Sequence, residues 1–318
     1  MRAAVVREYG AVVVEEMATP EPADGEVLVR VHATSLNAVD WYGMKGRPLA
    51  ARPLMGLRKP KSSALGSDFA GVVAAVGDGV DDFAAGDEVY GCDGGAFAEY
   101  VIVAKAVERK PANMSFEEAA AVPVAALTAL QGLRDHAHLQ PGQRVLVNGA
   151  AGGVGTFAVQ VGKALGAEVH AVCSAANVEQ ARELGADRVF DYGREDFTRG
   201  GVRYDVLFDN AGSRSWRSMC RVLTPTATVV LVGGPRRKRL FGPLGHVARM
   251  LLAGKLSKRT VLFFIAKPNR DDLTALRELI EGGKVRSVIE HRYELAQIAE
   301  AMHRLDSGHA RAKTVVTV

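Results

Sequence analysis

The pattern of hydrophobic and polar positions divides the chain into two textures that meet near Pro111. Residues 1–110 alternate between apolar and polar side chains over short runs, as in EVLVRVHATSLN at 26–37, and glycines separate these runs. Alternation with a period of two is typical of strands, and short strands between tight turns favour a small barrel. The first third of the chain is therefore predicted to be a β-rich domain.

From Ser115 onward the pattern changes to helices and buried strands in alternation. Ser115 and Glu118 form a capping box for a helix that Pro123 is expected to interrupt or kink. The alternation that follows is typical of βαβ units and predicts an α/β fold with a doubly wound parallel sheet. The expected strands are RVLVNG (144–149), EVHAVC (168–173), DRVFDY (187–192), YDVLFDN (204–210), ATVVLVG (227–233) and RTVLFFIA (259–266), and the tail adds a helix at 270–282 and a strand, KTVVTV, at 313–318.

Length and composition agree with two folded domains. A chain of 318 residues is near the size at which one core divides into two, and 48% hydrophobic with 24% charged residues is ordinary for a soluble globular protein. The net charge of +4 is modest, and the most basic run, PRRKRL at 235–240, lacks interleaved aromatics, so no nucleic-acid partner is expected. No apolar run reaches about eighteen residues and the N-terminus alternates like a strand, so a cytoplasmic location is expected.

The stretch VNGAAGGVGTFAVQV at 147–161 is a candidate phosphate-binding loop. Gly149, Gly152 and Gly155 follow a buried strand and open a helix. Without side chains, the backbone N–H groups can approach a pyrophosphate closely, and the helix N-terminus favours negative charge. The alternative is a tight turn that binds nothing.

The strand after this loop favours NADP over NAD. A site selective for NAD usually ends that strand with an acid that binds the ribose hydroxyls, whereas here the strand ends HAVCSAAN. An acid about 4 Å from a 2′-phosphate would cost several kcal/mol at an effective dielectric constant of 20. Ser174 and Asn177 could donate hydrogen bonds to that phosphate, with charge from Arg194 or Arg182 unless these are solvated surface arginines.

Seven stretches carry a family resemblance that covers nearly the whole chain: SLNAVDWYGMKG, LGSDFAGVVAAVG, AGDEVYG, GAFAEY, VNGAAGGVG, VCSAANVEQARELGAD and GHARAKTVVTV. Together they resemble the zinc-independent quinone oxidoreductase branch of the medium-chain dehydrogenase/reductase superfamily. The resemblance implies a GroES-like β-rich barrel domain at 1–114 and 267–318. It implies a Rossmann NADPH-binding domain at 115–266, with the active site in the cleft. CSAAN followed by LGAD is similar to the NADPH-preferring members of this branch.

Departures from the zinc alcohol dehydrogenases of this superfamily point to a metal-free site. Those enzymes place a cysteine in the segment that matches SLNAVD and a His-Glu pair after the glycine of LGSDFAG, where this chain has Asn37, Ser67 and Asp68. His136 and His138 have no third ligand near them in sequence. Without a metal to polarise a saturated ketone, an intrinsically electrophilic acceptor is the better substrate. Quinones and α,β-unsaturated carbonyls fit, with hydride supplied by NADPH.

The resemblance also implies roles for particular residues. Asn37 and Tyr42 would lie beside the nicotinamide and the substrate, with Asp40 shaping their loop. Tyr42 is the expected enolate hydrogen-bond donor or proton source, unless it is a structural tyrosine packed under the loop. Thr128 would otherwise be an ordinary threonine in the interior of a helix, and Phe264 would otherwise only pack in the core. The implied cofactor-binding residues are Asn37, Thr128, Asn148, Gly149, Gly152, Gly153, Val154, Ser174, Asn177, Tyr192, Asn210, Gly233 and Phe264.

Partners and the segment at 235–258 leave several interpretations open. This segment carries Leu244, Val247, Met250 and Leu251 on one helical face, which suits a lid, a peripheral membrane contact or packing against the neighbouring domain. RTVLFFIA could pair with a second subunit as an edge strand, and relatives of this type commonly form homodimers that way. An NADPH-binding structural or regulatory protein with little turnover is the alternative function.

Overall fold

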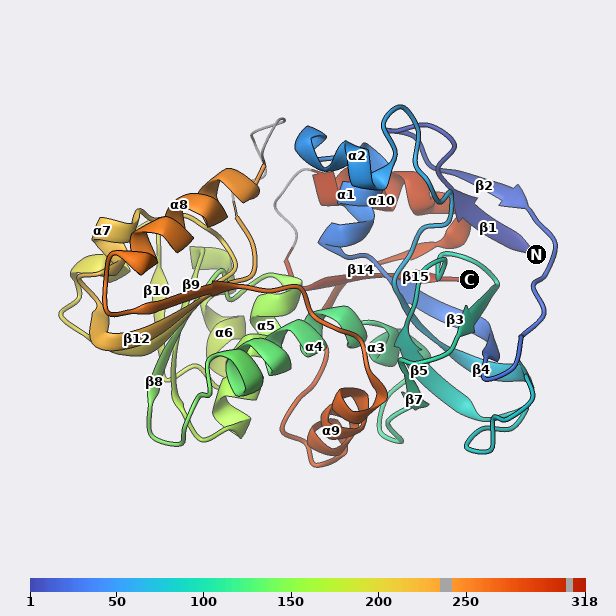
Figure 1. Cartoon of the computed structure of the whole chain (residues 1–318). Coiled ribbons are helices and arrows are strands. Elements are labelled where there is room, and N and C mark those ends of the chain that lie inside the picture. The colour runs from blue at the N-terminus through green and yellow to red at the C-terminus, as the bar shows by residue number, and fades with distance from the viewer. Residues whose placement is uncertain (235–241, 307–310) are drawn as a thin grey trace. The chain divides into compact units, whose positions relative to one another are not determined.

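The computed structural model describes residues 1–234, 242–306 and 311–318 (Figure 1). The chain forms two compact units: unit 1 is Met1–Leu127 with Lys267–Val318, and unit 2 is Thr128–Ala266. The two units meet inside helix α4 (Pro123–Leu130) and after Ala266, whereas the domain boundaries expected from the sequence follow residues 114 and 266.

Residues 115–127 belong to unit 1 because of how they pack. Ser115 caps α3 (Phe116–Ala120) through the predicted capping box with Glu118, and Pro123 begins a new helix, so the expected interruption is present. Helix α3 contacts strands β3, β4, β5 and β15 of the β-rich sheet. The backbone N–H of Val124 also donates to Asp68 Oδ1 at 2.8 Å. These contacts tie the segment to unit 1.

Unit 1 is built on a seven-stranded sheet in the order β14-β15-β3-β4-β5-β7, with β6 also paired to β3. The alternating run at 26–37 becomes β3, whose valines point with those of β4 and β5 into an apolar core. The β-rich unit expected from the sequence is therefore present. Its strands are β1 (Arg2–Val5), β2 (Val13–Glu16), β3 (Val27–Ser35), β4 (Asp68–Val76), β5 (Glu88–Cys92), β6 (Tyr100–Val103), β7 (Val107–Arg109), β14 (Ile289–Glu294) and β15 (Lys313–Thr317).

A second apolar cluster in unit 1 supports the segment that follows β3. Trp41 and Met44 of helix α1 are buried there against Met302 of helix α10. The loop expected around Asp40 is instead a helix over residues 38–45, which ends at Gly46 in the left-handed conformation. Besides α3, the helices of unit 1 are α1 (Ala38–Lys45), α2 (Arg52–Met55), α9 (Arg270–Glu281) and α10 (Ile298–Asp306). Two 3₁₀ turns lie at Leu49–Ala51 and Leu295–Gln297.

Unit 2 contains the predicted doubly wound sheet, with six parallel strands in the order β10-β9-β8-β11-β12-β13. Strand order reverses between β8 and β11, the position at which such sheets bind nucleotides. Its strands are β8 (Arg144–Asn148), β9 (Glu168–Cys173), β10 (Arg188–Asp191), β11 (Tyr204–Asp209), β12 (Leu223–Leu231) and β13 (Thr260–Phe263); its helical segments are Gln131–His136 (π), α5 (Gly153–Ala164), Ala175–Asn177 (3₁₀), α6 (Val178–Glu183), Phe197–Arg199 (3₁₀), α7 (Trp216–Met219) and α8 (Leu244–Lys255).

Helix α8 packs along β13 within unit 2 (Figure 1). Val247 and Met250 are buried in the core of this unit, and Leu251 is half-buried against it, whereas Leu244 is 41% exposed. The apolar face predicted for 244–251 thus packs largely on its own sheet. Residues 235–241 of the same segment lie outside the described part of the chain.

Candidate functional site

The carboxyl ends of the parallel strands in unit 2 carry most of the expected cofactor residues. Asn148 ends β8 and Asn210 follows β11, so these two residues flank the point where strand order reverses. The N–H of Asn210 donates to the carbonyl of Asn148 at 3.0 Å, which holds the two strand ends together. Ser174 follows β9, Tyr192 follows β10, Gly233 lies just beyond β12 and Phe264 follows β13.

The glycine loop between β8 and α5 has the form that a pyrophosphate requires. Gly149 has φ of +90°, a left-handed conformation that favours glycine. A Cβ at Gly155 would lie 2.1 Å from the Gly149 carbonyl oxygen, so glycine is needed there for packing. Gly152 caps α5 with an ordinary φ of −78°, and a Cβ there would come no closer than 3.6 Å to the protein.

The difference between Gly155 and Gly152 indicates whether the loop can hold a nucleotide. Neither the backbone nor a protein neighbour requires glycine at 152, yet the residue opens the helix whose first N–H groups, including those of Gly153 and Val154, lack partners within the helix. The absence of any steric need for glycine at position 152 and the positive end of α5 suit a phosphate group. The loop therefore fits the pyrophosphate of a dinucleotide.

Polar groups gather at the ends of β9 and β10. Asn177 Nδ2 donates to Ser174 Oγ at 2.9 Å, so the two residues proposed for the 2′-phosphate lie together. Tyr192 is 60% exposed, as an adenosine-contacting side chain would be before the nucleotide binds. Sequence reasoning missed Asp191, which pairs in register with Cys173 at the end of β9. Its carboxylate lies 3.6 Å from Arg194, the arginine considered for this site.

Asp209 and His246 form a buried pair beside the point where strand order reverses, and sequence reasoning missed this pair. Asp209 ends β11, and its Oδ1 accepts hydrogen bonds from Asn148 Nδ2 at 2.7 Å and from the N–H of Gly212 at 2.9 Å. Its Oδ2 has no hydrogen-bond partner in the described part of the chain and lies 3.9 Å from His246 Nε2 on α8. The carboxylate thereby orients Asn148, and the only sequence signal for it is the polar end of YDVLFDN.

The remaining cofactor candidates of unit 2 lie at its edges. A Cβ at Gly233 would meet the Asn210 carbonyl at 2.3 Å, so this glycine permits close packing of two strand ends. The ring of Phe264 contacts the ring of His136 in a tilted arrangement, with centroids 4.4 Å apart, and is half-buried. Thr128 is half-buried within α4.

In unit 1, Asn37 belongs to a buried network that includes an ammonium group. Asn37 follows β3, and its Nδ2 donates to Asp68 Oδ2 at 2.7 Å. Lys313, the first residue of β15, donates to Asn37 Oδ1 at 2.6 Å and lies 3.2 Å from Asp68 Oδ2. Ser35 Oγ donates to the same Asp68 oxygen at 2.7 Å. The side chain of Asn37 is thus fixed by a carboxylate on one side and an ammonium on the other.

Lys313 is the member of this network that sequence reasoning missed. Its side chain is 3% exposed, and the Asp68 side chain is fully buried. A buried charge is stable only when it is paired and hydrogen-bonded, as both are here. The stretch GHARAKTVVTV marks Lys313 as part of the resemblance, but nothing in its pattern shows that the ammonium turns inward.

A second carboxylate, Asp40, lies beside this network. Asp40 Oδ2 accepts from the N–H of Asn37 at 2.7 Å, and Asp40 Oδ1 accepts from Ser67 Oγ at 2.8 Å. Burial raises the pKa of Asp40 to about 7, opposed by these two hydrogen bonds; the nearby Asp68 charge raises it further and Lys313 lowers it. Asp40 is therefore a carboxyl group that can hold or release a proton near neutral pH.

Tyr42 lies on α1, two residues after Asp40. Its ring meets Trp41 edge to face at 5.0 Å between centroids, and it packs against the apolar cluster of α1 and α10. The side chain is half-buried. This packing suits the structural interpretation of Tyr42, and partial exposure leaves the proton-donor interpretation open.

No group of three or more His, Cys, Asp and Glu side chains suited to a metal ion occurs in the described ranges. At the positions considered for zinc, both carboxylate oxygens of Asp68 already accept hydrogen bonds, Oδ1 from Val124 and Oδ2 from Ser35, Asn37 and Lys313. Lys313 also places a positive charge where a cation would bind. The donor set at Asn37, Ser67 and Asp68 therefore does not fit a divalent metal.

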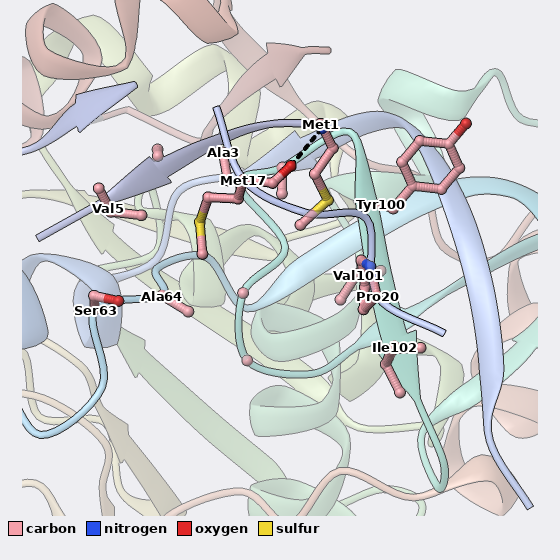
Figure 2. A pocket seen from close by; sticks show the side chains of 14 residues that line it. Met1, Ala3, Val5, Met17, Pro20, Ser63, Ala64, Tyr100, Val101 and Ile102 are labelled. Atoms are coloured by element: carbon pink, nitrogen blue, oxygen red, sulfur yellow. Dashed lines mark hydrogen bonds between the residues drawn. The ribbon is translucent and has the colours of Figure 1, made fainter. Parts of the chain in front are cut away.

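Figure 2 shows a separate, mainly apolar pocket in unit 1 with a volume of about 220 Å³. The side chains of Met1, Met17 and Val101 line it, and the N-terminal ammonium donates to the Met17 carbonyl at 2.7 Å. It shares no residue with the Asn37 network. We assign no role in the reaction to this pocket.

Comparisons with known proteins agree with this architecture. Residues 23–112 match the family described as alcohol dehydrogenase GroES-like domain, and residues 184–316 match the family described as zinc-binding dehydrogenase. The chain is 33% identical over 316 residues to a chloroplast envelope quinone oxidoreductase homolog of Arabidopsis thaliana, which covers 95% of this chain and 92% of the relative. It is 32% identical to 2-methylene-furan-3-one reductase of Solanum lycopersicum, covering 99% and 79%.

Solved structures give the same result. The quinone oxidoreductase from Coxiella burnetii has a TM-score of 0.87 at 28% identity, with 100% of this chain and 99% of that chain covered. Escherichia coli quinone oxidoreductase, solved in complex with NADPH, has a TM-score of 0.84 at 26% identity, with full coverage of both chains. Among the described helices, none has the length and apolar character to cross a bilayer.

The fold, the glycine loop at the switch point and these relatives lead to one conclusion. The relatives are named as quinone oxidoreductases, NAD(P)H oxidoreductases and an enone reductase, and one structural neighbour was solved with NADPH. The chain belongs to the medium-chain dehydrogenase/reductase superfamily and is an oxidoreductase of its quinone oxidoreductase-like group.

Proposed function

We propose that this protein is an NADPH-dependent, metal-independent reductase of quinones or α,β-unsaturated carbonyl compounds. The network of Asn37, Asp68 and Lys313 carries the proposal. Its carboxylate is saturated with hydrogen bonds and neutralised by an ammonium, so these residues are unsuited to hold a Lewis-acidic metal. The acceptor must then stabilise developing charge by its own conjugation, as quinones and enones do.

NADPH, when bound, supplies the hydride. In unit 2, Gly152, Gly153 and Val154 would hold its pyrophosphate, and Asn148, Asn210, Gly233 and Phe264 would surround its nicotinamide half, with Thr128 as a further contact. In unit 1, Asn37 would contact the nicotinamide and the acceptor through an amide that Lys313 and Asp68 prevent from rotating. Such fixed polar groups lower the reorganisation needed during reaction. Tyr42 would donate a hydrogen bond to the acceptor oxygen.

Preference for NADPH rests on the end of β9. Ser174 stands where an NAD-selective site usually carries an acid, and its hydroxyl is held by Asn177 and free to donate. Asp191 lies nearby, but Arg194 at 3.6 Å offsets its charge.

Replacement of Ser174 by Asp should reverse the cofactor preference. A carboxylate about 4 Å from a 2′-phosphate costs about 4 kcal/mol per pair of unit charges at an effective dielectric constant of 20. We expect kcat/KM for NADPH to fall at least about 10-fold relative to NADH in S174D, with S174A as the uncharged control. An unchanged ratio in S174D would mean that the phosphate binds elsewhere.

We further propose that the protein is a homodimer through β13. This strand pairs with β12 alone among the described strands, and next to it Phe263 is 38% and Ile265 78% exposed. An unpaired edge with exposed apolar side chains favours pairing with a second copy. A cytoplasmic location stays a prediction, since relatives include proteins named as mitochondrial and chloroplast forms.

Absorbance assays of NADPH oxidation test the proposed reaction. Purified protein is offered a naphthoquinone, an alkenone and a saturated ketone in separate reactions, with and without a chelator. We expect oxidation with the quinone or the alkenone, none with the saturated ketone, and no effect of the chelator. Tight NADPH binding without consumption would favour a structural or regulatory nucleotide-binding protein.

A further inference from the structure

The proposed reaction leaves a proton to be supplied. Hydride addition to a quinone or an enone leaves negative charge on the acceptor oxygen, and that oxygen must be protonated. We propose that Ser67 donates this proton and that Asp40 resupplies it, so that the two residues form a proton relay beside Asn37. This inference rests on the proposed function, because the relay acts on its reduced acceptor.

The geometry joins three residues in one chain of hydrogen bonds. Ser67 Oγ lies 2.8 Å from Asp40 Oδ1, while Asp40 Oδ2 is held at 2.7 Å by the N–H of Asn37. Asp40 is 4% exposed, so it reaches solvent or substrate only through a neighbour. Ser67 is half-buried and is that neighbour. A substrate placed by Asn37 would therefore lie within two hydrogen bonds of the Asp40 carboxyl group.

A neighbouring serine and aspartate show why this pair differs. Ser35 donates to Asp68 at 2.7 Å, but Ser35 is fully buried and Asp68 is ion-paired with Lys313 at 3.2 Å. That pair can neither exchange a proton with a substrate nor accept one from solvent. Asp40 has no such ion pair among the described contacts. The charged groups that act on it are Asp68, which disfavours its ionisation, and Lys313, which favours it.

The transfer balances atom by atom. The Ser67 O–H bond breaks as a new O–H bond forms on the acceptor oxygen. Ser67 Oγ takes the proton from Asp40 Oδ1 at the same time and is again a hydroxyl. Asp40 becomes a carboxylate that accepts from Ser67 and from the Asn37 N–H, and it recovers a proton from water through Ser67. A pKa of about 7 allows Asp40 to be refilled at neutral pH.

Three variants test the relay: S67A removes the donor, D40N keeps the hydrogen bonds without the ionisable proton, and S67T restores a hydroxyl. We expect kcat in the wild-type protein to fall above pH 7. D40N should lose this ionisation, and S67A should lose about 10²-fold in kcat with a smaller change in KM. S67T should recover activity. The matched control S257A, which removes a half-buried serine hydroxyl that donates to the Gly254 carbonyl in unit 2, should keep the wild-type pH profile.

A readout independent of turnover is the infrared carbonyl band of a protonated carboxylic acid. In the wild-type protein it should disappear on titration through pH 7, and in D40N it should be absent. Turnover by D40N with the wild-type pH profile, or S67A behaving like S257A, would overturn the relay and leave the proposed function standing. Absence of NADPH oxidation by the wild-type protein with every activated acceptor would contradict the proposed function, and the relay with it.

Discussion

At the scale of single residues, the network around Asp68 combines burial, charge and orientation. Lys313 brings a positive charge to Asp68 at 3.2 Å and to Asn37 at 2.6 Å, in surroundings from which water is excluded. Such a pair contributes little net stability when intact, because desolvation offsets attraction. Loss of one partner leaves the other buried and unpaired, which costs far more.

Replacement of Lys313 by Met should therefore destabilise the protein by about 3–5 kcal/mol, because Asp68 would keep its burial and lose its cation. The matched control is K45M, which removes a half-buried lysine 3.4 Å from Asp306 and should cost at most about 1 kcal/mol. Urea unfolding of both variants at one pH measures the difference. Equal midpoints for K313M and the wild-type protein would show that Asp68 is neutral or solvated.

Asp40 should make stability depend on pH with a definite sign. Its pKa in the folded protein, about 7, is above that of an unfolded aspartate, so its contribution is fully present at acid pH and is lost as pH rises through 7. The change approaches roughly 4 kcal/mol between pH 4 and pH 8. The free energy of unfolding of D40N should not show this loss. Parallel unfolding curves for D40N and wild type at both pH values would contradict the raised pKa.

Sequence reasoning reached part of this residue-scale picture. Asn37 and Asp40 follow from the resemblance, since SLNAVD is one of its stretches. Lys313 does not, because a lysine at the start of a strand is usually solvated and only tertiary packing turns it inward. In the sequence, Ser67 is only a departure from the pattern of metal ligands. Its hydrogen bond to Asp40 could not be derived there, because it depends on where helix α1 places Asp40.

At the scale of elements, the strand-loop-helix unit of β8 and α5 separates two uses of glycine. Gly155 is required because Gly149 approaches it, whereas a Cβ at Gly152 would come no closer than 3.6 Å to the protein. The pattern VNGAAGGVG predicts the element but does not distinguish these uses, since every glycine looks alike in a sequence.

Alanine at each glycine should separate folding from binding. G152A should unfold within about 1 kcal/mol of wild type and weaken NADPH binding by about 10-fold or more, because its Cβ enters the phosphate space. G155A should lose about 1–3 kcal/mol of stability through overpacking against Gly149. Calorimetric titration with NADPH and thermal unfolding measure both. Full NADPH affinity in G152A would show that the phosphate does not sit over this residue.

Elements with a strong period were predictable, and short ones were not. The strands of the parallel sheet and helix α5 follow from alternation and from glycine and proline signals, whereas strand β14 at the edge of the β-rich sheet was not predicted. Helix α1 spans only Ala38–Lys45 and mixes buried Trp41 with exposed Val39, so its period is weak. The first domain boundary is hard to derive from the sequence, because the capping box at Ser115 marks only the start of a helix and does not show on which sheet that helix packs.

At the scale of the whole molecule, the exposed edge of unit 2 is the strongest sign of assembly. Phe263 and Ile265 flank the end of β13, and Leu256, just after α8, is 85% exposed. Scattered exposed leucines are common on monomers, but an apolar edge strand is not.

Replacement of Ile265 by Asp should disrupt the proposed dimer, because a charge at the pairing edge opposes association. The control is L54D, which introduces the same acid at an 80% exposed position in unit 1 and should leave the assembly unchanged. Sedimentation equilibrium of both variants measures the mass. A wild-type protein that sediments as a monomer at micromolar concentration would rule out the dimer, and an I265D dimer would place its interface elsewhere.

The measurement that tests the central claim most directly is transfer of deuterium from NADPH deuterated at C4 to an alkenone, followed by mass spectrometry of the product after chelator treatment of the protein. The proposed function predicts a saturated ketone that carries one deuterium at the former β-carbon, formed at the same rate with and without chelator. Unconsumed NADPH, or activity that the chelator abolishes, would contradict it.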